Sequence, residues 1–366
     1  MKILLIGFSK ITYMPYLNFY LSVLEDTGAV IHIIKWNRDN TSDVSLDQDK
    51  MVVHEFDCKQ LDEASKLQKI PNFVKFRHFT QRVLHDQVFD RIIVMQSLPA
   101  VLLADILLNE YANRFILDYR DYTYEDFGAF KSVIGKLVKA SYATFVSSDA
   151  FRDALPKLDK VYTSHNLLVD SLAHRDAHPA RLQSRLPIRI AFWGFIRHEK
   201  INEEIIRKLG GDMRFELHYY GREQRTAWNL KALVEKEQFS NVFFHGTYLP
   251  EERYAFAAQT DLIHNMYENE AGMQKAMSNK YYDGIIFRIP QLCTSGSYMG
   301  KRVEKDGVGC ALDPFDDGFI DQLVHYYQEY DRSQFEKNCD RACEKIVSEF
   351  KKGQDIICEF AMTDKV

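Results

Sequence analysis

Short apolar runs alternate with segments of helical spacing along this chain, and the alternation begins twice. The predicted strands of the first half are 3–7, 30–35, 91–96, 114–118, 143–147 and 160–164. A polar stretch with helix-interrupting prolines follows at 174–187, and the predicted strands after it are 188–193, 215–220, 242–245, 262–266 and 290–294. This alternation is typical of strand–helix units in a parallel sheet. The sequence therefore predicts an α/β protein with two doubly wound sheets.

We expect the domains to span 1–173 and 188–345, with a helical tail over 346–366 that packs back on the N-terminal domain. The 366 residues suffice for two cores, at about 100–200 residues per domain. Two such sheets imply a cleft between two domains, and ligands bind beyond the carboxyl ends of the strands. The loops that follow the predicted strands are therefore the candidate binding sites.

Charge and hydropathy exclude several classes of protein. The chain carries 47 basic and 52 acidic side chains, and its net charge of -5 argues against a general nucleic-acid binder. It has no run of roughly 18 apolar residues, the length that a membrane-spanning helix needs. Its six cysteines are scattered without the spacing of a zinc site, so we expect reduced thiols in a cytoplasmic protein.

The strongest local signal is the segment 277–290, which combines a helix start with charge. Ser278 or Asn279 can cap a helix whose free backbone N–H groups form an anion site. Lys280 adds a cation in the first turn, where it opposes the helix dipole unless an anion is present. Asp283 follows on the same face and can accept hydrogen bonds from vicinal hydroxyls. A diphosphate next to a ribose would satisfy these features; the alternative is a surface helix on which Lys280 and Asp283 pair.

A second pair of cations follows the predicted strand 188–193. Gly194 permits a tight turn, and Arg197 and Lys200 place two positive charges in the loop that leads to the next helix. This arrangement suits a leaving diphosphate. The alternative is that both are solvated loop charges partnered by Glu199 and Glu203.

Several segments of the second half follow one another in an order that is familiar from one enzyme family. They are Gly194 with Arg197 and Lys200, then Tyr219–Arg222, 242–252, 278–290 and Gly307–Gly309. This part resembles the donor-binding domain of family 4 glycosyltransferases with the GT-B fold, in particular those that assemble bacterial capsule, exopolysaccharide or O-antigen chains. The resemblance covers most of 188–314, and in the first half only the architecture and an Asp-x-Arg-Asp element at 118–121. It implies two Rossmann-like domains that face a central cleft.

The resemblance also implies roles for individual residues. Arg197 and Lys200 would hold the diphosphate of a nucleotide-sugar, and Lys280 would reinforce them. Asp283 would bind the ribose. The other expected donor-binding residues are Gly194, Gly221, Arg222, Tyr248, Ser278 and Asn279, with the loops at Gly221 and Tyr248 flanking the base.

One element of the family pattern is altered in this chain. The family's Glu-x7-Glu element has Asp283 in its second place but Lys275 in its first, and Glu268 and Glu270 are out of register. We expect the loop 268–274, with Glu270, to contact the donor sugar.

Catalysis in such a site needs positive charge for the departing diphosphate and a close acceptor hydroxyl. Arg197 and Lys200 would supply this charge, so we expect no metal and no cofactor other than the nucleotide-sugar itself. The Asp-x-Asp sequence at 47–49 has the form of a metal-binding element, but it lies in a polar loop without an apolar strand before it.

In the first half, the candidate catalytic residue is Asp121. It could orient the acceptor or the sugar, or act as a base. The alternative is that Asp118 and Asp121 pair with Arg120 and Arg114 to fix a loop.

The segment 66–82 contains no acidic residue, and its apolar side chains interleave with cations. This composition suits contact with anionic lipid headgroups at the inner face of a membrane, where a lipid-linked acceptor would be found. The alternative is a helix that packs Phe73, Phe76 and Phe79 into the first domain and leaves its cations in water.

The sequence thus leaves three functions open. The first is a metal-independent glycosyltransferase that uses a nucleotide diphosphate sugar, for which we expect uridine, and a saccharide or lipid-linked saccharide acceptor; the resemblance implies retention of configuration. The second is a nucleotide-sugar epimerase or hydrolase, which would act on the donor alone. The third is a non-catalytic nucleotide-sugar-binding subunit. A nicotinamide dehydrogenase is disfavoured because Gly7 to Lys10 contains no Gly-x-Gly-x-x-Gly sequence.

Overall fold

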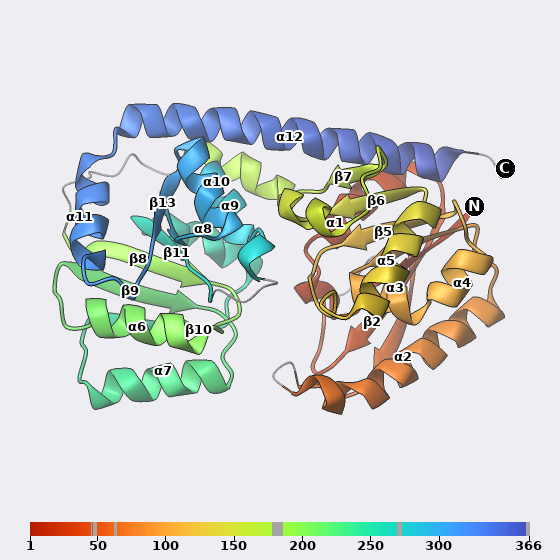
Figure 1. The fold of residues 1–366 in the computed structure, drawn as a ribbon, viewed down its shortest axis with the longest axis horizontal. Coiled ribbons are helices and arrows are strands. Elements are labelled where there is room, and N and C mark those ends of the chain that lie inside the picture. Colours follow the sequence, from red (N-terminus) through yellow and green to blue (C-terminus); the bar gives the residue numbers. More distant parts are fainter. Residues whose placement is uncertain (45, 47–49, 62–63, 178–185, 269–272, 364–366) are drawn as a thin grey trace. The chain divides into compact units, whose positions relative to one another are not determined.

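A computed structural model describes the chain except for 45, 47–49, 62–63, 178–185, 269–272 and 364–366. Contacts divide the chain into two compact units (Figure 1). Unit 1 comprises Met1–Asn166 and Ser348–Val366, and unit 2 comprises Leu167–Val347. Each is built around one parallel sheet, as the sequence predicts.

Unit 1 contains a seven-stranded sheet in the order β3-β2-β1-β4-β5-β6-β7. Its elements are β1 (Lys2–Ile6), α1 (Leu17–Leu24), β2 (Val30–Asn37), β3 (Met51–Asp57), α2 (Lys66–Asp86), β4 (Arg91–Met95), α3 (Ser97–Leu102), α4 (Ala104–Asn109), β5 (Phe115–Tyr119), α5 (Gly128–Ala140), β6 (Ala143–Val146) and β7 (Val161–Thr163). From β1 the chain proceeds to β2 on one side, whereas β4 lies on the other side and leads to β5. The direction of winding therefore reverses between β1 and β4.

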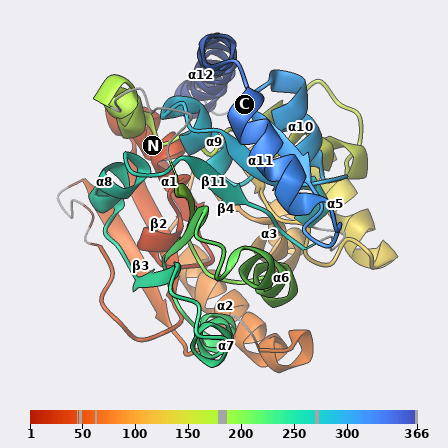
Figure 2. The same ribbon diagram turned by 90° about the vertical axis from the view of Figure 1, so that its left-hand side faces the viewer.

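Unit 2 contains a six-stranded sheet in the order β10-β9-β8-β11-β12-β13. Its elements are β8 (Ile188–Trp193), α6 (Glu199–Leu209), β9 (Phe215–Tyr220), α7 (Arg225–Lys236), β10 (Val242–Gly246), α8 (Arg253–Ala257), β11 (Leu262–Asn265), α9 (Asn279–Ile286), β12 (Gln291–Thr294), α10 (Tyr298–Asp306), β13 (Gly309–Leu312) and α11 (Phe319–Glu329). Figure 2 shows α6 and α7 beside the sheet, and their apolar side chains share a core with β8 and β9. Here the winding reverses between β8 and β11.

The last helix, α12 (Arg332–Met362), belongs to both units. In unit 2, Asp340 accepts hydrogen bonds from Arg288, at 3.0 Å from Nη2. In unit 1, the ring of Phe350 lies 4.8 Å from that of Phe19. None of the helices in the described part of the chain is long and apolar enough to cross a membrane.

Two strands, β3 and β13, are absent from the prediction, and both lie at sheet edges. A central strand of a doubly wound sheet is covered on both faces and reads as a continuous apolar run, as β4 does. In β3 only Met51 and Phe56 are buried, because the edge is open to solvent. Its apolar pattern is correspondingly weak.

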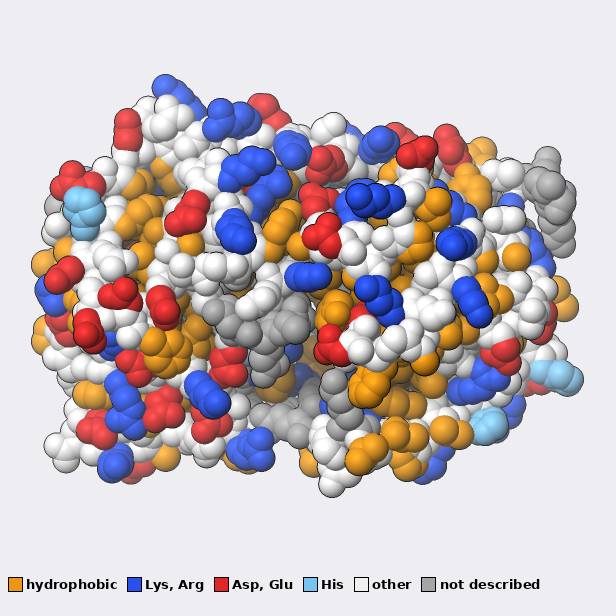
Figure 3. Space-filling model, in the orientation of Figure 1, with side chains coloured by type: hydrophobic (Ala, Val, Ile, Leu, Met, Phe, Trp, Pro, Cys, Tyr) orange, Lys and Arg blue, Asp and Glu red, His pale blue; other side chains and the backbone are white. Residues whose placement is uncertain are grey.

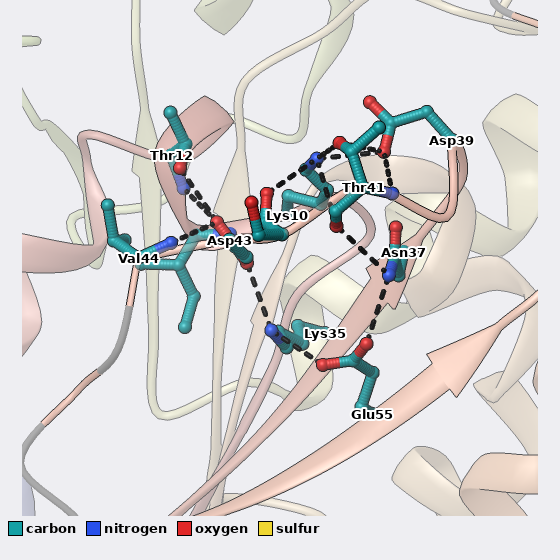
Figure 4. A network of polar contacts seen from close by, with 11 residues as sticks. Lys10, Thr12, Lys35, Asn37, Asp39, Thr41, Asp43, Val44 and Glu55 are labelled. Atoms are coloured by element: carbon teal, nitrogen blue, oxygen red, sulfur yellow. Dashed lines mark hydrogen bonds and ion pairs between the residues drawn. The ribbon is translucent and has the colours of Figure 1, made fainter. Parts of the chain in front are cut away.

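A network of polar contacts fixes the loops that follow β1 and β2 (Figure 4). The carboxylate of Asp43 accepts hydrogen bonds from the backbone N–H groups of Ile11 (2.9 Å) and Thr12 (3.1 Å) and from the ammonium of Lys35 (3.1 Å). Although burial opposes ionisation, these hydrogen bonds lower the pKa of Asp43 to about 2. Lys10, which is also buried, donates to Asp39 at 2.8 Å. Both cations of this network are therefore neutralised.

Candidate functional site

Backbone hydrogen bonds join the chain segments at the ends of β8, β9 and β10, at the carboxyl end of the sheet in unit 2. Gly194 donates from its backbone N–H to the carbonyl of Tyr220 at 2.9 Å, and Gly221 donates to Gly246 at 2.6 Å. Gly221 has a φ of 144°, and a Cβ at this position would lie 1.7 Å from the carbonyl oxygen of Gly194. Only glycine permits this approach. The predicted residues Gly194 and Gly221 thus lie in contact.

Buried polar groups fix the loop that carries Arg197, whereas Lys200, expected in the same loop, lies in the first turn of α6. The side-chain amide of Asn202, in α6, donates to the carbonyls of Arg197 (2.8 Å) and His198 (2.9 Å). Its oxygen accepts from Nε2 of His264 at 2.8 Å, while Nδ1 of His264 accepts from the Met266 backbone N–H at 3.3 Å. Burial, with the charge of Lys280, lowers the pKa of His264 to about 3, so this ring is neutral.

Arg197 and Lys200 are themselves exposed, and His198 between them has a left-handed backbone with a φ of 66°. The glutamates suggested as their partners bind other groups: Glu199 accepts from Asn229 at 2.9 Å, and Glu203 pairs with Arg207 at 2.8 Å. That alternative is therefore wrong for these two glutamates. Sequence reasoning missed Asn202 and His264, because their hydrogen bonds join elements far apart in the chain.

Lys280 is the most unusual residue of this region. Its side chain is buried, with 5% of the residue exposed. The ammonium donates to the Tyr267 hydroxyl at 2.7 Å and to the Trp193 carbonyl at 3.3 Å, and it lies 4.1 Å from the centroid of the Phe192 ring. No carboxylate of the described residues forms an ion pair with it. A buried cation without a counter-charge is costly, and the first turn of α9 adds its own positive end.

The start of α9 corrects one expectation. Ser278 occupies the N-cap position, but its side chain does not cap the helix. Instead its hydroxyl donates to Oδ1 of Asn265 at 2.6 Å, because this buried amide oxygen needs a hydrogen-bond donor. Asn279 is the exposed first residue of the helix. The backbone N–H groups of the first turn therefore have no side-chain cap beside Lys280.

Asp283 lies one turn further along α9 and is also buried, with 3% exposed. Its Oδ2 accepts from Nε1 of Trp193 at 2.8 Å, and Nε of Arg253 lies 3.8 Å from its Oδ1. Burial raises the pKa of Asp283, although Arg253, Trp193 and Lys280 oppose this rise. Lys280 and Asp283 do not pair with each other, so the suggested surface ion pair is wrong.

Aromatic side chains surround Asp283. Tyr248, in the loop after β10, packs edge-on against Phe256 at 5.1 Å between ring centroids. Phe256 in turn stacks on Tyr220 at 4.2 Å. Burial and the neighbouring charge of Asp283 raise the pKa of Tyr248 to about 12. The expected base-flanking residue Arg222 stands over the ring of Phe195, at 4.3 Å from the centroid.

The acidic residues expected near the donor sugar are only partly described. Glu268 accepts a hydrogen bond from the backbone N–H of Lys200 at 3.0 Å, which places its carboxylate at the start of α6. Glu270 lies outside the described residues, within 269–272. The Asp-x-Asp sequence at 47–49 is likewise not described. Elsewhere in the described chain, no group of His, Cys, Asp or Glu side chains could hold a metal ion.

In unit 1, the end of β5 carries a buried ion pair. Nε of Arg120 donates to Asp118 at 2.7 Å, and its Nη2 donates to Ser164 at 3.0 Å. A further hydrogen bond joins Arg120 to Asn166. Arg120 therefore joins the end of β5 to the residues that follow β7, and the pair of Asp118 with Arg120 agrees with the structural alternative. Arg114 instead donates to the carbonyl of Glu110 and lies over the ring of Tyr111. Asp121 is exposed at the same end of the sheet.

The segment 66–82 lies within α2 and packs as the structural alternative supposed. Phe73 and Phe76 are buried, and the ring of Phe76 stacks on Trp36 at 5.6 Å. Arg77 pairs with Asp105 at 2.7 Å.

The outer face of the same helix is apolar and basic. Leu67, Ile70 and Val74 are 77%, 49% and 45% exposed. Figure 3 shows hydrophobic side chains gathered at the lower right, where Figure 1 shows α2.

No protein-family model matches the sequence, and no curated protein matches it. Among solved structures, sucrose-phosphate synthase from Thermosynechococcus elongatus is similar over 97% of this chain and 96% of its own, with a TM-score of 0.71 and 11% identity. The protein therefore has the GT-B fold.

Two further GT-B structures are similar over nearly their whole length. Anabaena HepE, solved in complex with UDP and glucose, has a TM-score of 0.64 and 13% identity over 98% of both chains. WaaG, a glycosyltransferase involved in lipopolysaccharide biosynthesis, has a TM-score of 0.62 and 13% identity over 98% of this chain and 99% of its own. At such identities the similarity establishes the fold. The chemistry must be argued from the side chains.

Proposed function

We propose that this protein is a glycosyltransferase that moves a sugar from a nucleotide diphosphate sugar to a saccharide acceptor. The observation that carries the proposal is Lys280, a buried cation with no carboxylate partner in the described chain. It lies where the winding reverses between β8 and β11, because it contacts the end of β8 through Trp193 and the end of β11 through Tyr267. Ligands of doubly wound sheets bind at such reversals.

A diphosphate fits this position. Lys280 would contact it from the sheet side, Arg197 from the loop that Asn202 fixes, and Lys200 from the first turn of α6. These cations would stabilise the charge of the departing diphosphate, and the proposed reaction accordingly needs no metal. The uncapped first turn of α9, with Ser278 and Asn279, would add backbone N–H donors.

The ribose and base of the nucleotide would lie along the aromatic side chains of Tyr248, Phe256 and Tyr220. One carboxylate oxygen of Asp283 accepts a hydrogen bond from Trp193, and its other oxygen can accept one from a ribose hydroxyl. Tyr248 and Arg222, with the loop at Gly221, would enclose the base. Glu270 would contact the sugar, and Asp121 of unit 1 would orient the acceptor or remove its proton.

Uridine as the base and a surface polysaccharide as the product are parts of the same proposal. HepE was solved with UDP, and WaaB, similar at a TM-score of 0.63 and 10% identity, is a lipopolysaccharide galactosyltransferase. Retention of configuration is also proposed; a trehalose-6-phosphate synthase studied for transfer with retention has a TM-score of 0.67 and 9% identity.

We further propose that α2 brings the enzyme to a lipid-linked acceptor at the inner face of the cell membrane. The exposed apolar side chains Leu67, Ile70 and Val74 lie among exposed cations, including Lys75 and Arg82. An apolar stripe flanked by cations suits an anionic bilayer surface. Vesicles with anionic lipid should therefore sediment the wild type and release a Lys75→Glu/Arg82→Glu variant; equal binding of both would contradict this part.

The function is tested by thermal shift and turnover. The wild type is screened with UDP, GDP, ADP, dTDP and their sugar conjugates, since a ligand that binds only the folded state raises the Tm. The selected donor is then incubated with and without saccharide acceptors. Release of nucleotide only with an acceptor supports transfer. Release without an acceptor would indicate an epimerase or hydrolase, and binding without release a non-catalytic subunit.

A further inference from the structure

Gln96, the first residue after β4, has a backbone conformation that side chains rarely adopt. Its φ is 84° and its ψ is 153°. This region of φ/ψ space is populated almost solely by glycine, since a Cβ there meets its own backbone. Residues held in it cluster at binding and catalytic sites, because only a functional gain offsets the strain. Glycine would fit the turn better than glutamine does.

The surrounding structure holds Gln96 in this state. Its backbone N–H donates to the carbonyl of Asp118, at the end of β5, at 2.7 Å. The next residue, Ser97, is fully buried, and its hydroxyl lies 2.8 Å from that of Thr123 and 3.3 Å from the carbonyl of Asp121. The turn is thereby tied to the loop that carries Asp121.

The position of Gln96 is the reversal point of the sheet in unit 1. β4 pairs with β1, and the chain leaves these two strands toward opposite edges. The carboxyl ends of such a strand pair form the usual binding crevice of a doubly wound sheet. The side chain of Gln96 is half-buried there, and its amide has no hydrogen-bond partner among the residues that the structure describes.

The chemistry of this position indicates a neutral ligand. Two buried cations of unit 1 are paired with carboxylates, Lys10 with Asp39 at 2.8 Å and Arg120 with Asp118 at 2.7 Å. An amide both donates and accepts, which is what a sugar hydroxyl requires. We propose that Gln96 contacts a hydroxyl of the acceptor saccharide through its side-chain amide. This inference rests on the proposed glycosyl transfer and adds a residue of unit 1 that recognises the acceptor.

Two substitutions separate strain from recognition. Gln96→Gly removes both the amide and the strain, and we expect the Tm to rise by about 2–4 °C. Gln96→Ala removes the amide but keeps a Cβ. In both variants we expect kcat/KM for the acceptor to fall about 2- to 12-fold, the loss of one neutral hydrogen bond. The UDP thermal shift should stay at the wild-type value, because the donor residues are unchanged.

Asn113→Gly is the matched control. Asn113 also has a positive φ, 59°, but it lies exposed before β5, at the other end of that strand. Its acceptor kcat/KM should equal that of the wild type. Wild-type acceptor kinetics in both Gln96 variants, with transfer intact, would overturn the proposal for Gln96 alone. A wild type that transfers no sugar from any donor would overturn the proposed function, and this proposal with it.

Discussion

Substitution of Lys280 by methionine tests the proposed diphosphate site through its charge. Methionine keeps most of the apolar stem that packs near Phe192, and it removes the ammonium that donates to Tyr267 and Trp193. In the donor complex the ammonium would donate to a phosphate oxygen. A hydrogen bond to a charged group contributes about 1.5–3 kcal/mol, so we expect the Kd for UDP to rise about 10- to 150-fold.

The thermal shift follows from this change in affinity. With UDP at about 100 times the wild-type Kd, binding stabilises the wild type by about 2.7 kcal/mol. For a variant with a roughly 30-fold weaker Kd, the same UDP concentration gives about 0.9 kcal/mol. At about 2–4 °C per kcal/mol for a unit of this size, the shift falls from about 5–11 °C to about 2–4 °C.

The assay needs a lysine control and a charge control. Lys305→Met removes an exposed lysine of α10 and should keep the wild-type shift. Lys280→Arg keeps the charge and should retain more affinity than Lys280→Met. A folded Lys280→Met variant with the full wild-type shift would refute the reasoning, because the ammonium would then not contact the ligand. If that variant does not fold, a folded Lys280→Gln variant with the full wild-type shift would refute it equally.

The remaining predictions concern the groups that hold the loops. Gly221→Ala should lower the free energy of unfolding by about 3 kcal/mol or more, because its Cβ would lie 1.7 Å from a backbone carbonyl oxygen. Gly246→Ala is the control and should lower it by only about 1 kcal/mol, because no atom lies within 4 Å of a Cβ at that position. Equal urea midpoints for the two would contradict the proposed close approach. Asp43→Asn should cost about 2 kcal/mol at pH 7, because the pKa of Asp43 is lowered from 3.8 to about 2. A lowered pKa gives stability that is present above about pH 4 and lost toward pH 2, so the difference in urea unfolding should shrink over that range; a constant difference would show that the charge is not responsible. Asn202→Leu should cost about 2–3 kcal/mol and weaken UDP binding, since it leaves His264 and two carbonyls unpaired. Unchanged UDP affinity in that variant would show that the hydrogen bonds of Asn202 do not support the donor site.

The sequence predicted the central strands because a strand that is buried on both faces consists of a continuous run of apolar residues. β8 begins and ends where the apolar run 188–193 does, and β1 differs from the predicted 3–7 by one residue at each end. The edge strands β7 and β10 were predicted, whereas β3 and β13 were not. In β3 polar residues interrupt the apolar run and only Met51 and Phe56 are buried, and β13 is only four residues long, so neither strand has a long apolar run in the sequence.

The candidate site was predictable as a set of residue types and not as a set of contacts. The sequence indicates that Lys280 lies in a first helical turn near Asp283, but spacing alone favours a pair between them as much as a ligand. The direction of the ammonium, toward Trp193 and Tyr267, depends on the packing of α9 against β8 and β11. Ser278 shows the same limit, because its hydroxyl binds Asn265 from another element.

The two sheets differ in the charge of the side chains near the point where their winding reverses, and this difference agrees with the ligands proposed for them. In unit 1, buried cations near the carboxyl ends of the strands are paired with carboxylates, Lys10 with Asp39 and Arg120 with Asp118. In unit 2, Lys280 has no such partner among the described residues. Because a buried charge requires compensation, we expect the anionic part of the proposed substrate to bind unit 2. Unit 1 has a strained, neutral amide at the corresponding point, and we expect the neutral saccharide of the proposed reaction to bind there.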